Sequence, residues 1–323
     1  MVVAVRILRD IDIQESIDIA KVVERIEDGY RADARGEIVP FPRVRLDAGA
    51  VSMAWLGAAI ESMDLLGYRS YVYNSEGYDR GEQVVVLYGH KNMDVRAVFV
   101  GRLIGNLRTG ASLAAALHMM GPHTREVGFI GTGDQARNAL ACIAAVLRPS
   151  RLVAWSPNKL RREKFRRWAR SRLGVDVELA RDVGEVVRDV PTVVLATSAE
   201  NTLVTSDMIT GPKLLLSISA YRRPEIDPWL LDSARRVWTD SIAQASGPGT
   251  LFDSDSLRTK LRPLGEGIAD GSARDPSVTR ILINTGAAWE ELLVAQLMFE
   301  IAESRGIGAK LPMPRVRPSA AVF

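Results

Sequence analysis

Cysteine and histidine are scarce in this chain of 323 residues. It contains one cysteine, Cys142, and three histidines, His90, His118 and His123. A single cysteine can form neither an internal disulfide nor a cysteine-based zinc site, and the histidines have none of the spacings typical of metal motifs. The sequence therefore predicts a protein without disulfides or a bound metal, in a reducing compartment.

Long apolar runs and a strong charge of one sign are also absent. No apolar run approaches the length needed to span a bilayer, and residues 1–14 lack the continuous apolar core of a signal peptide. The 42 Lys and Arg residues nearly balance the 39 Asp and Glu residues, which leaves a net charge of +3. That charge is too small to require a nucleic-acid or membrane partner, so we expect neither, and we expect a cytoplasmic location.

The length and the 47% hydrophobic content predict a large core and two domains. Residues 15–34 have apolar side chains at helical spacing. Short strand-like runs follow and predict a mostly antiparallel sheet in the first third, at 44–46, 51–56, 68–73, 83–88 and 96–100.

From about Ala111 the pattern changes to alternating helices and strands. A helix is expected at 111–119, a strand at 127–130 and a long helix at 135–147, and the alternation continues to about residue 239. Repeated βαβ units predict a doubly wound parallel sheet, so the expected fold class is α/β. A last helix is expected at 286–304, followed by an irregular tail that contains Pro and Arg.

A glycine pair follows the strand expected at 127–130. Gly131 allows a tight turn, Gly133 lets the backbone approach a pyrophosphate, and Ala136 lets helix and strand pack closely. The free N–H groups of the following helix favour an anion. This motif is weak alone, but strand, helix and further βαβ units occur in the required order. It predicts a nicotinamide dinucleotide site formed by Gly131, Thr132, Gly133, Asp134, Gln135 and Ala136.

The end of the next strand, at 151–155, bears on the choice between NAD and NADP. NAD sites usually place an acidic residue there for the ribose 2′-OH, but this chain has none before Glu163. The segment therefore favours NADP, with NAD still possible. An alternative is that its charges are the solvated face of a helix, and a nucleic-acid patch is disfavoured because no known module is present. The candidate cofactor residues here are Ser156, Asn158, Lys159 and Arg161.

Several segments together resemble the ornithine cyclodeaminase/mu-crystallin superfamily over nearly the whole chain. They are the G-x-G-x-Q-A loop at 131–136, an R-T-G-A segment at 108–111, A-T-S at 196–198, P-E-I-D at 224–227 and D-S-I-A-Q-A at 240–245. The resemblance implies an N-terminal substrate and dimerisation domain (1–113 with 296–323) and a Rossmann domain (114–295). It also implies a homodimer and places further residues at the cofactor, namely Thr109, Ala196, Thr197, Ser198 and Ser219.

The resemblance also implies arginines that bind the substrate carboxylate. Arg108 matches the family's arginine in the R-T motif, and Arg43 matches an arginine on the first strand, with Arg45 as a competitor two residues later. Arg69 stands where the family usually has a lysine. An arginine can bind a carboxylate bidentately but cannot shuttle a proton at neutral pH.

The catalytic candidates are Arg69 and Tyr221. Tyr221 stands where ornithine cyclodeaminases have a catalytic aspartate, so cyclodeamination is in doubt. Tyr221 could donate a proton, stack on the nicotinamide ring or be a surface tyrosine. Glu61 and Asp64 could supply a carboxylate on the opposite wall, although solvated charges at a helix end are favoured.

These observations predict an NAD(P)-dependent oxidoreductase. It would transfer hydride between nicotinamide and the α-carbon of an amino acid or of a cyclic or open imine or ketimine. Two alternatives stay open: an ornithine cyclodeaminase, and a non-catalytic NADPH-binding protein like mu-crystallin.

Overall fold

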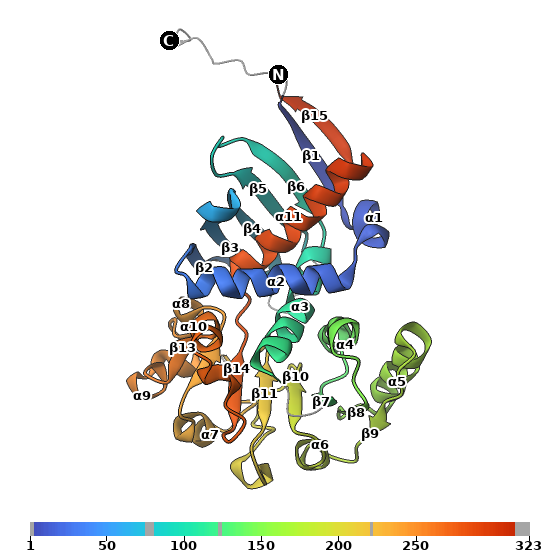
Figure 1. Ribbon diagram of the computed structural model, residues 1–323, viewed down its shortest axis with the longest axis vertical. Coiled ribbons are helices and arrows are strands. Elements are labelled where there is room, and N and C mark those ends of the chain that lie inside the picture. Colours follow the sequence, from blue (N-terminus) through green and yellow to red (C-terminus); the bar gives the residue numbers. More distant parts are fainter. Residues whose placement is uncertain (1–2, 75–80, 122–124, 220–221, 314–323) are drawn as a thin grey trace.

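The computed structural model describes residues 3–74, 81–121, 125–219 and 222–313. Within these residues the strands form two separate sheets, one in the upper and one in the lower half of Figure 1. No helix in the described ranges is both long and apolar enough to cross a bilayer.

The first sheet has seven strands within the described residues. Its neighbours pair antiparallel, except that β1 and β6 are parallel. The expected antiparallel sheet in the first third is therefore confirmed, with longer strands than the sequence predicted. In spatial order the strands are β15 (Ala309–Met313), β1 (Val3–Arg9), β6 (Val95–Val100), β5 (Gln83–Gly89), β4 (Leu65–Asn74), β3 (Val51–Ile60) and β2 (Ile38–Ala48).

The described part of the tail after the last helix is not irregular as expected. Residues 309–313 form β15, which pairs antiparallel with β1, so that Arg6 lies opposite Lys310. Pro312 is tolerated because β15 is an edge strand, where one missing N–H donor does not break the sheet. Local patterns could not reveal this strand, because its partner lies about 300 residues earlier in the chain.

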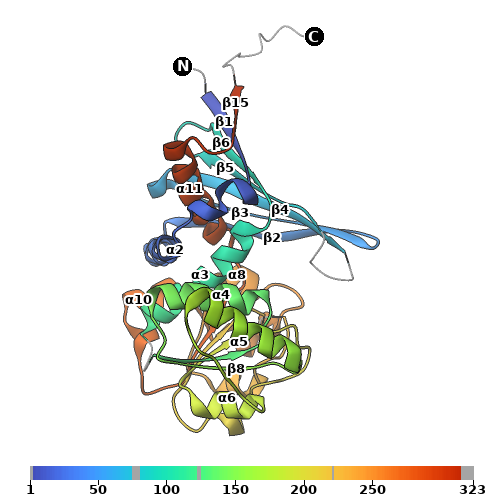
Figure 2. The ribbon, with the colours of Figure 1, turned by 90° about the vertical axis from the view of Figure 1, so that its right-hand side faces the viewer.

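Two long helices cover one face of the first sheet (Figure 2). The helix expected at 15–34 is α2 (Ile19–Ala34), and it begins later because Asp18 accepts a hydrogen bond from the Ala20 N–H (3.0 Å). It lies beside α11 (Ala288–Arg305) on the same side of the sheet (Figure 2). The residues before α2 form α1 (Asp10–Ile13) and η1 (Gln14–Ser16), and η2 (Glu61–Met63) follows β3.

The second sheet confirms the expected doubly wound parallel arrangement, since all its described neighbours pair in parallel. The strand order reverses between β7 and β10, which is where such sheets bind ligands beyond the carboxyl ends of their strands. The spatial order is β13 (Leu261–Pro263), β12 (Val237–Thr239), β14 (Arg280–Ile283), β11 (Leu214–Ser217), β10 (Thr192–Leu195), β7 (Glu126–Ile130), β8 (Arg151–Trp155) and β9 (Glu178–Leu179).

Helices flank this sheet on both faces (Figures 1 and 2). They include α4 (Asp134–Val146), α5 (Lys159–Leu173), α6 (Val183–Asp189), α7 (Pro228–Ser233), α8 (Ile242–Ala245), α9 (Asp255–Arg258) and α10 (Leu264–Ala269). Short 3-10 turns are η3 (Ser206–Met208), η4 (Leu251–Asp253) and η5 (Ser272–Arg274).

The two sheets are joined by long helices rather than by loose linkers. α3 (Leu103–Met120) follows β6 of the first sheet and packs against α4, and α11 follows β14 of the second sheet and packs against β3 and β4. The expected domain boundaries at 113/114 and 295/296 fall inside these helices. The two-domain division itself stays a prediction.

Candidate active site

The turn after β7 has the shape of a phosphate cradle. Gly131 has a φ of +102°, and a Cβ there would lie 2.2 Å from the carbonyl oxygen of Ala196, so a side chain cannot be accommodated. The space around the Cα of Gly133, at the start of α4, is open. The Thr132 Oγ1 is buried and has no hydrogen-bond partner among the described residues. These features fit the pyrophosphate of a dinucleotide.

A cavity of about 250 Å³ adjoins this turn, and we call it the cofactor cavity. No aspartate or glutamate lies among its lining residues in the described ranges. Eight of the residues predicted to contact the cofactor line it: Gly131, Thr132, Gly133, Ser156, Arg161, Ala196, Thr197 and Ser198.

Four predicted cofactor residues line neither this cavity nor the one described in the next paragraph. The Asp134 side chain is 88% exposed and pairs with Arg137 (3.5 Å), and Asn158 caps α5 by accepting from the Arg161 N–H (3.0 Å). Lys159 is exposed, and Ala136 is buried between helix and strand. None of the four lines the cofactor cavity, so their contact with a dinucleotide stays a prediction.

A second cavity, of about 330 Å³, lies between the two sheets, and we call it the reaction cavity. It shares Thr197 and Ser198 with the cofactor cavity. The sequence-predicted residues that line it are Arg43, Arg69, Arg108, Thr109, Gln135 and Ser219. Thr109 donates to the Gly105 carbonyl (2.8 Å) and does not line the cofactor cavity, and Tyr221 lies outside the described residues.

Arg69 is held at the wall of the reaction cavity by β4. It is 7% exposed, it pairs with Glu291 of α11, and its Nη2 donates to the Gln83 Oε1 (2.7 Å). Its guanidinium lies 4.5 Å from the centre of the Tyr71 ring. Burial lowers the pKa of Arg69, and the charge of Glu291 opposes that shift. Since arginine starts from a very high pKa, Arg69 remains a cation.

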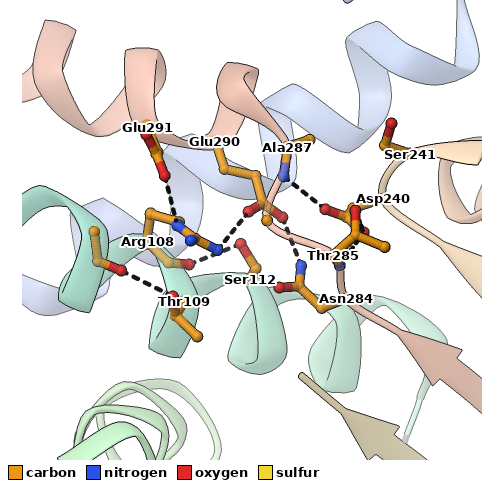
Figure 3. A network of polar contacts seen from close by, with 12 residues as sticks. Arg108, Thr109, Ser112, Asp240, Ser241, Asn284, Thr285, Ala287, Glu290 and Glu291 are labelled. Atoms are coloured by element: carbon orange, nitrogen blue, oxygen red, sulfur yellow. Dashed lines mark hydrogen bonds and ion pairs between the residues drawn. The ribbon is translucent and has the colours of Figure 1, made fainter. Parts of the chain in front are cut away.

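Arg108 projects from α3 toward the start of α11 (Figure 3). Its Nε donates to Glu291 Oε1 (3.1 Å) and its Nη1 to Glu290 Oε2 (3.4 Å). Gly286 has a φ of +78°, and a Cβ there would lie 2.5 Å from Arg108 Nη1, so only glycine leaves room for the guanidinium. Arg43 reaches the same loop, with its Nη2 donating to the Gly286 carbonyl (3.2 Å).

Asp240 holds the loop at 284–287 in place. Its carboxylate accepts from the N–H groups of Thr285 (2.6 Å) and Ala287 (2.8 Å) and from the Thr285 hydroxyl (3.0 Å). Hydrogen bonds to a buried carboxylate from fixed backbone donors are strong and directional. Asp240 therefore holds the segment that brings Arg43 and Arg108 to one cavity.

Glu225 organises the wall that both cavities share. It is completely buried and accepts hydrogen bonds from the hydroxyls of Thr197, Ser217 (3.3 Å) and Ser219. Burial raises the pKa of Glu225, and these three donors act in the opposite direction. The contacts link the ends of β10 and β11 beside the cradle, where the nicotinamide end of a dinucleotide would lie.

The family model for the ornithine cyclodeaminase/mu-crystallin family matches residues 3–306. This chain belongs to that family.

The alignments with individual relatives cover most of both proteins. Iminosuccinate reductase of Paracoccus denitrificans is 25% identical over 89% of this chain and 93% of that protein. Alanine dehydrogenase of Archaeoglobus fulgidus is 23% identical over 96% of this chain and 99% of that protein. The crystal structure of the Paracoccus reductase with NAD+ covers 96% of this chain and 100% of its own, with a TM-score of 0.85 and 22% identity, and so shares the fold.

Sequence reasoning missed four residues that line the reaction cavity or contact its arginines, namely Gln83, Asn284, Glu290 and Glu291. The two glutamates open α11, and acids at a helix start usually do no more than favour the helix dipole. Here both are fully buried and face arginines of the reaction cavity. Glu225 and Asp240 belong to the family motifs at 224–227 and 240–245, but the sequence predicted no role for either residue. Glu61 and Asp64 do not line the reaction cavity.

Glu290 holds its proton at neutral pH. Burial and the charge of Asp240 raise its pKa to about 8, while Arg108, Ser112 and Asn284 act in the opposite direction. Tyr30 also faces this group, and the Glu290 charge contributes to the raised pKa of Tyr30. A protonated Glu290 leaves the charge of Arg108 less balanced than an ionised Glu290 would.

We expect Glu290→Gln to change how stability depends on pH. Between about pH 4.5 and 8 the unfolded chain loses the Glu290 proton while the folded protein retains it, so this group lowers wild-type stability as pH rises. The substitution removes that contribution, because an amide does not titrate in this range. Urea denaturation across this window should show the wild type losing stability relative to the variant. Glu300→Gln, on the exposed side of α11, is the control, and equal pH profiles for wild type and Glu290→Gln would contradict the assignment.

Proposed function

We propose that this protein is an NAD(P)-dependent oxidoreductase that acts on an amino acid or a cyclic or open imine. The observation that carries the proposal is the wall of Thr197 and Ser198 that the two cavities share. The arginines of the reaction cavity therefore lie next to the cofactor cavity, which supports a substrate carboxylate bound beside a dinucleotide. A bound nicotinamide would supply or accept the hydride, exchanged with the substrate α-carbon.

The chain's own contribution is orientation and charge. Arg43, Arg69 and Arg108 approach the reaction cavity from β2, β4 and α3, so they can hold a substrate carboxylate from three directions. Each is anchored on its far side by carbonyl or carboxylate groups, which restricts its motion before a ligand binds. Such positioning lowers the entropy cost of bringing the α-carbon to the nicotinamide. The reductases and the dehydrogenase among the relatives support a redox reaction.

Arg108→Lys should lower kcat/KM by at least about tenfold, because lysine keeps the charge but loses the two-pronged geometry. The assay follows oxidation of NADPH or NADH with α-keto acids and ammonium, and oxidation of L-amino acids in reverse. Arg170→Gln, in the exposed part of α5, is the control. An unchanged kcat/KM in Arg108→Lys would show that Arg108 does not bind the substrate carboxylate. Ammonia release from L-ornithine would favour a cyclodeaminase, and tight NADPH binding without any turnover would favour a binding protein.

We propose NADP as the preferred cofactor, with NAD possible. The cofactor cavity brings Ser156 and Arg161 to the end of β8, and among the described residues no carboxylate lines it there to accept hydrogen bonds from a ribose 2′-OH. A 2′-phosphate would instead meet a cation and a hydroxyl. The solved structure of the Paracoccus reductase contains NAD+, and the solved structure of Thermococcus litoralis pyrroline-2-carboxylate reductase contains NADH. Binding of NADP(H) and NAD(H) to this protein therefore needs direct comparison.

Quenching of tryptophan fluorescence should show tighter binding of NADPH than of NADH. Arg161→Gln should weaken NADPH binding by about tenfold and affect NADH much less, since only NADPH offers a 2′-phosphate. Arg166→Gln, one turn further along α5, serves as the control. Tighter binding of NADH to the wild type would overturn the preference.

We propose a homodimer formed through the open face of the first sheet. This face, opposite α2 and α11, exposes apolar side chains that include Phe41, Leu66, Tyr68 and Val72. An uncovered apolar sheet of this kind marks a protein interface. A solved archaeal relative is described as an alanine dehydrogenase dimer.

Light scattering should therefore give twice the chain mass for the wild type and the mass of one chain for Tyr68→Glu, which places a charge in the middle of that face. Trp229→Glu changes an exposed residue of α7 on the other sheet and should remain dimeric. A monomeric wild type would refute the interface.

A further inference from the structure

A third cavity opens next to the reaction cavity. It has a volume of about 320 Å³ and lies between β2 and the segment around α8, so both halves of the molecule contribute to it. It shares Arg43 and Arg222 with the reaction cavity and adds Arg45. Within the described ranges, no aspartate or glutamate lines either of these two cavities. We call it the side-chain cavity.

Cationic side chains outnumber acidic ones among the described residues that line these cavities. Arginines 43, 69, 108, 222 and 223 line the reaction cavity. Behind them Glu291 pairs with two of the five. The pyrophosphate of a cofactor belongs to the cradle on the other side of Thr197 and Ser198, so it lies away from the side-chain cavity.

Arg45 illustrates this excess. Its guanidinium lies 5.8 Å from the centre of the Tyr73 ring, and no carboxylate within ion-pair distance is found for it in the described part of the chain. Gln244 holds the opposite wall in place, since its Nε2 donates to the Thr285 hydroxyl (3.2 Å) and the Gly286 carbonyl (3.0 Å). The wall of the side-chain cavity is therefore tied to the loop that Arg43 contacts.

We infer that the side-chain cavity binds a second carboxylate, so that the preferred substrate is a dicarboxylic α-imino acid or α-amino acid. This inference rests on the proposed function. The α-carboxylate would occupy the Arg69 and Arg108 side of the reaction cavity, and the side-chain carboxylate would lie between Arg45 and Arg222. Guanidinium groups suit carboxylates because their N–H donors match both oxygens.

The reaction balances without any further reactant. In the reductive direction an α-keto acid and an ammonium ion condense with loss of water to form the protonated imine. Hydride from NAD(P)H then forms a C–H bond at the α-carbon, the C=N double bond becomes a single bond, and NAD(P)+ is released. Arg45 and Arg222 take no part in these bond changes, so they act through substrate affinity.

The test compares diacids with neutral acids of the same shape. Oxaloacetate is paired with 4-methyl-2-oxopentanoate, and 2-oxoglutarate with 5-methyl-2-oxohexanoate, because an isopropyl group replaces the second carboxylate in each. With ammonium and NADPH, at least one diacid should exceed its partner in kcat/KM by at least about tenfold. The double variant Arg45→Gln/Arg222→Gln should reduce that ratio by about tenfold, mainly through KM. Arg170→Gln should leave the ratio unchanged.

The outcomes separate this inference from the proposed function. If neutral acids react as well as diacids, the side-chain cavity does not bind a carboxylate, whereas the oxidoreductase assignment stands. If no acid reacts, the proposed function fails, and calorimetry then tests the cavity alone. With NADP+ present, glutarate should bind more tightly than 5-methylhexanoate, and the double variant should lose that difference. Equal affinities would overturn the inference.

Discussion

The structure depends on a buried cluster of arginines and glutamates at the start of α11. Glu290 and Glu291 meet Arg69 of β4 and Arg108 of α3, and all four side chains are largely removed from water. Burying a charge costs several kcal/mol unless it is paired and hydrogen-bonded, so each partner needs the others in place. The same contacts connect the helix that leaves the second sheet to the strand and helix of the first.

This arrangement explains why the candidate site lies between the sheets. Asp240 and Gln244 hold the loop at 284–287, and that loop receives Arg43 and makes room for Arg108. The guanidinium groups of Arg43, Arg69 and Arg108 are therefore held by protein contacts around one cavity.

The dinucleotide side is built by the strand order of the second sheet. β7 and β10 are neighbours at the point where that order reverses, so the turn at Gly131 and the segment at Thr197 emerge side by side. Glu225 then gathers the hydroxyls at the ends of β10 and β11. The two cavities share a wall because the segment after β10 borders the glycine turn on one side and the arginines from the first sheet and α3 on the other.

The sequence alone determined the parts that depend on local pattern. The glycine turn needs residues without side chains at fixed spacing, and the alternation of strands and helices is visible in the periodicity of apolar residues. Family motifs also indicated Arg43, Arg69 and Arg108, which the structure brings to one cavity. Tertiary structure decided what no local pattern could carry. β15 exists because it pairs with β1, and Glu290 and Glu291 differ from ordinary helix-end acids only because burial places them against distant arginines. The side-chain cavity likewise arises where β2 meets the α8 segment, about 200 residues later in the chain, since contacts at that separation are set by packing rather than by sequence spacing.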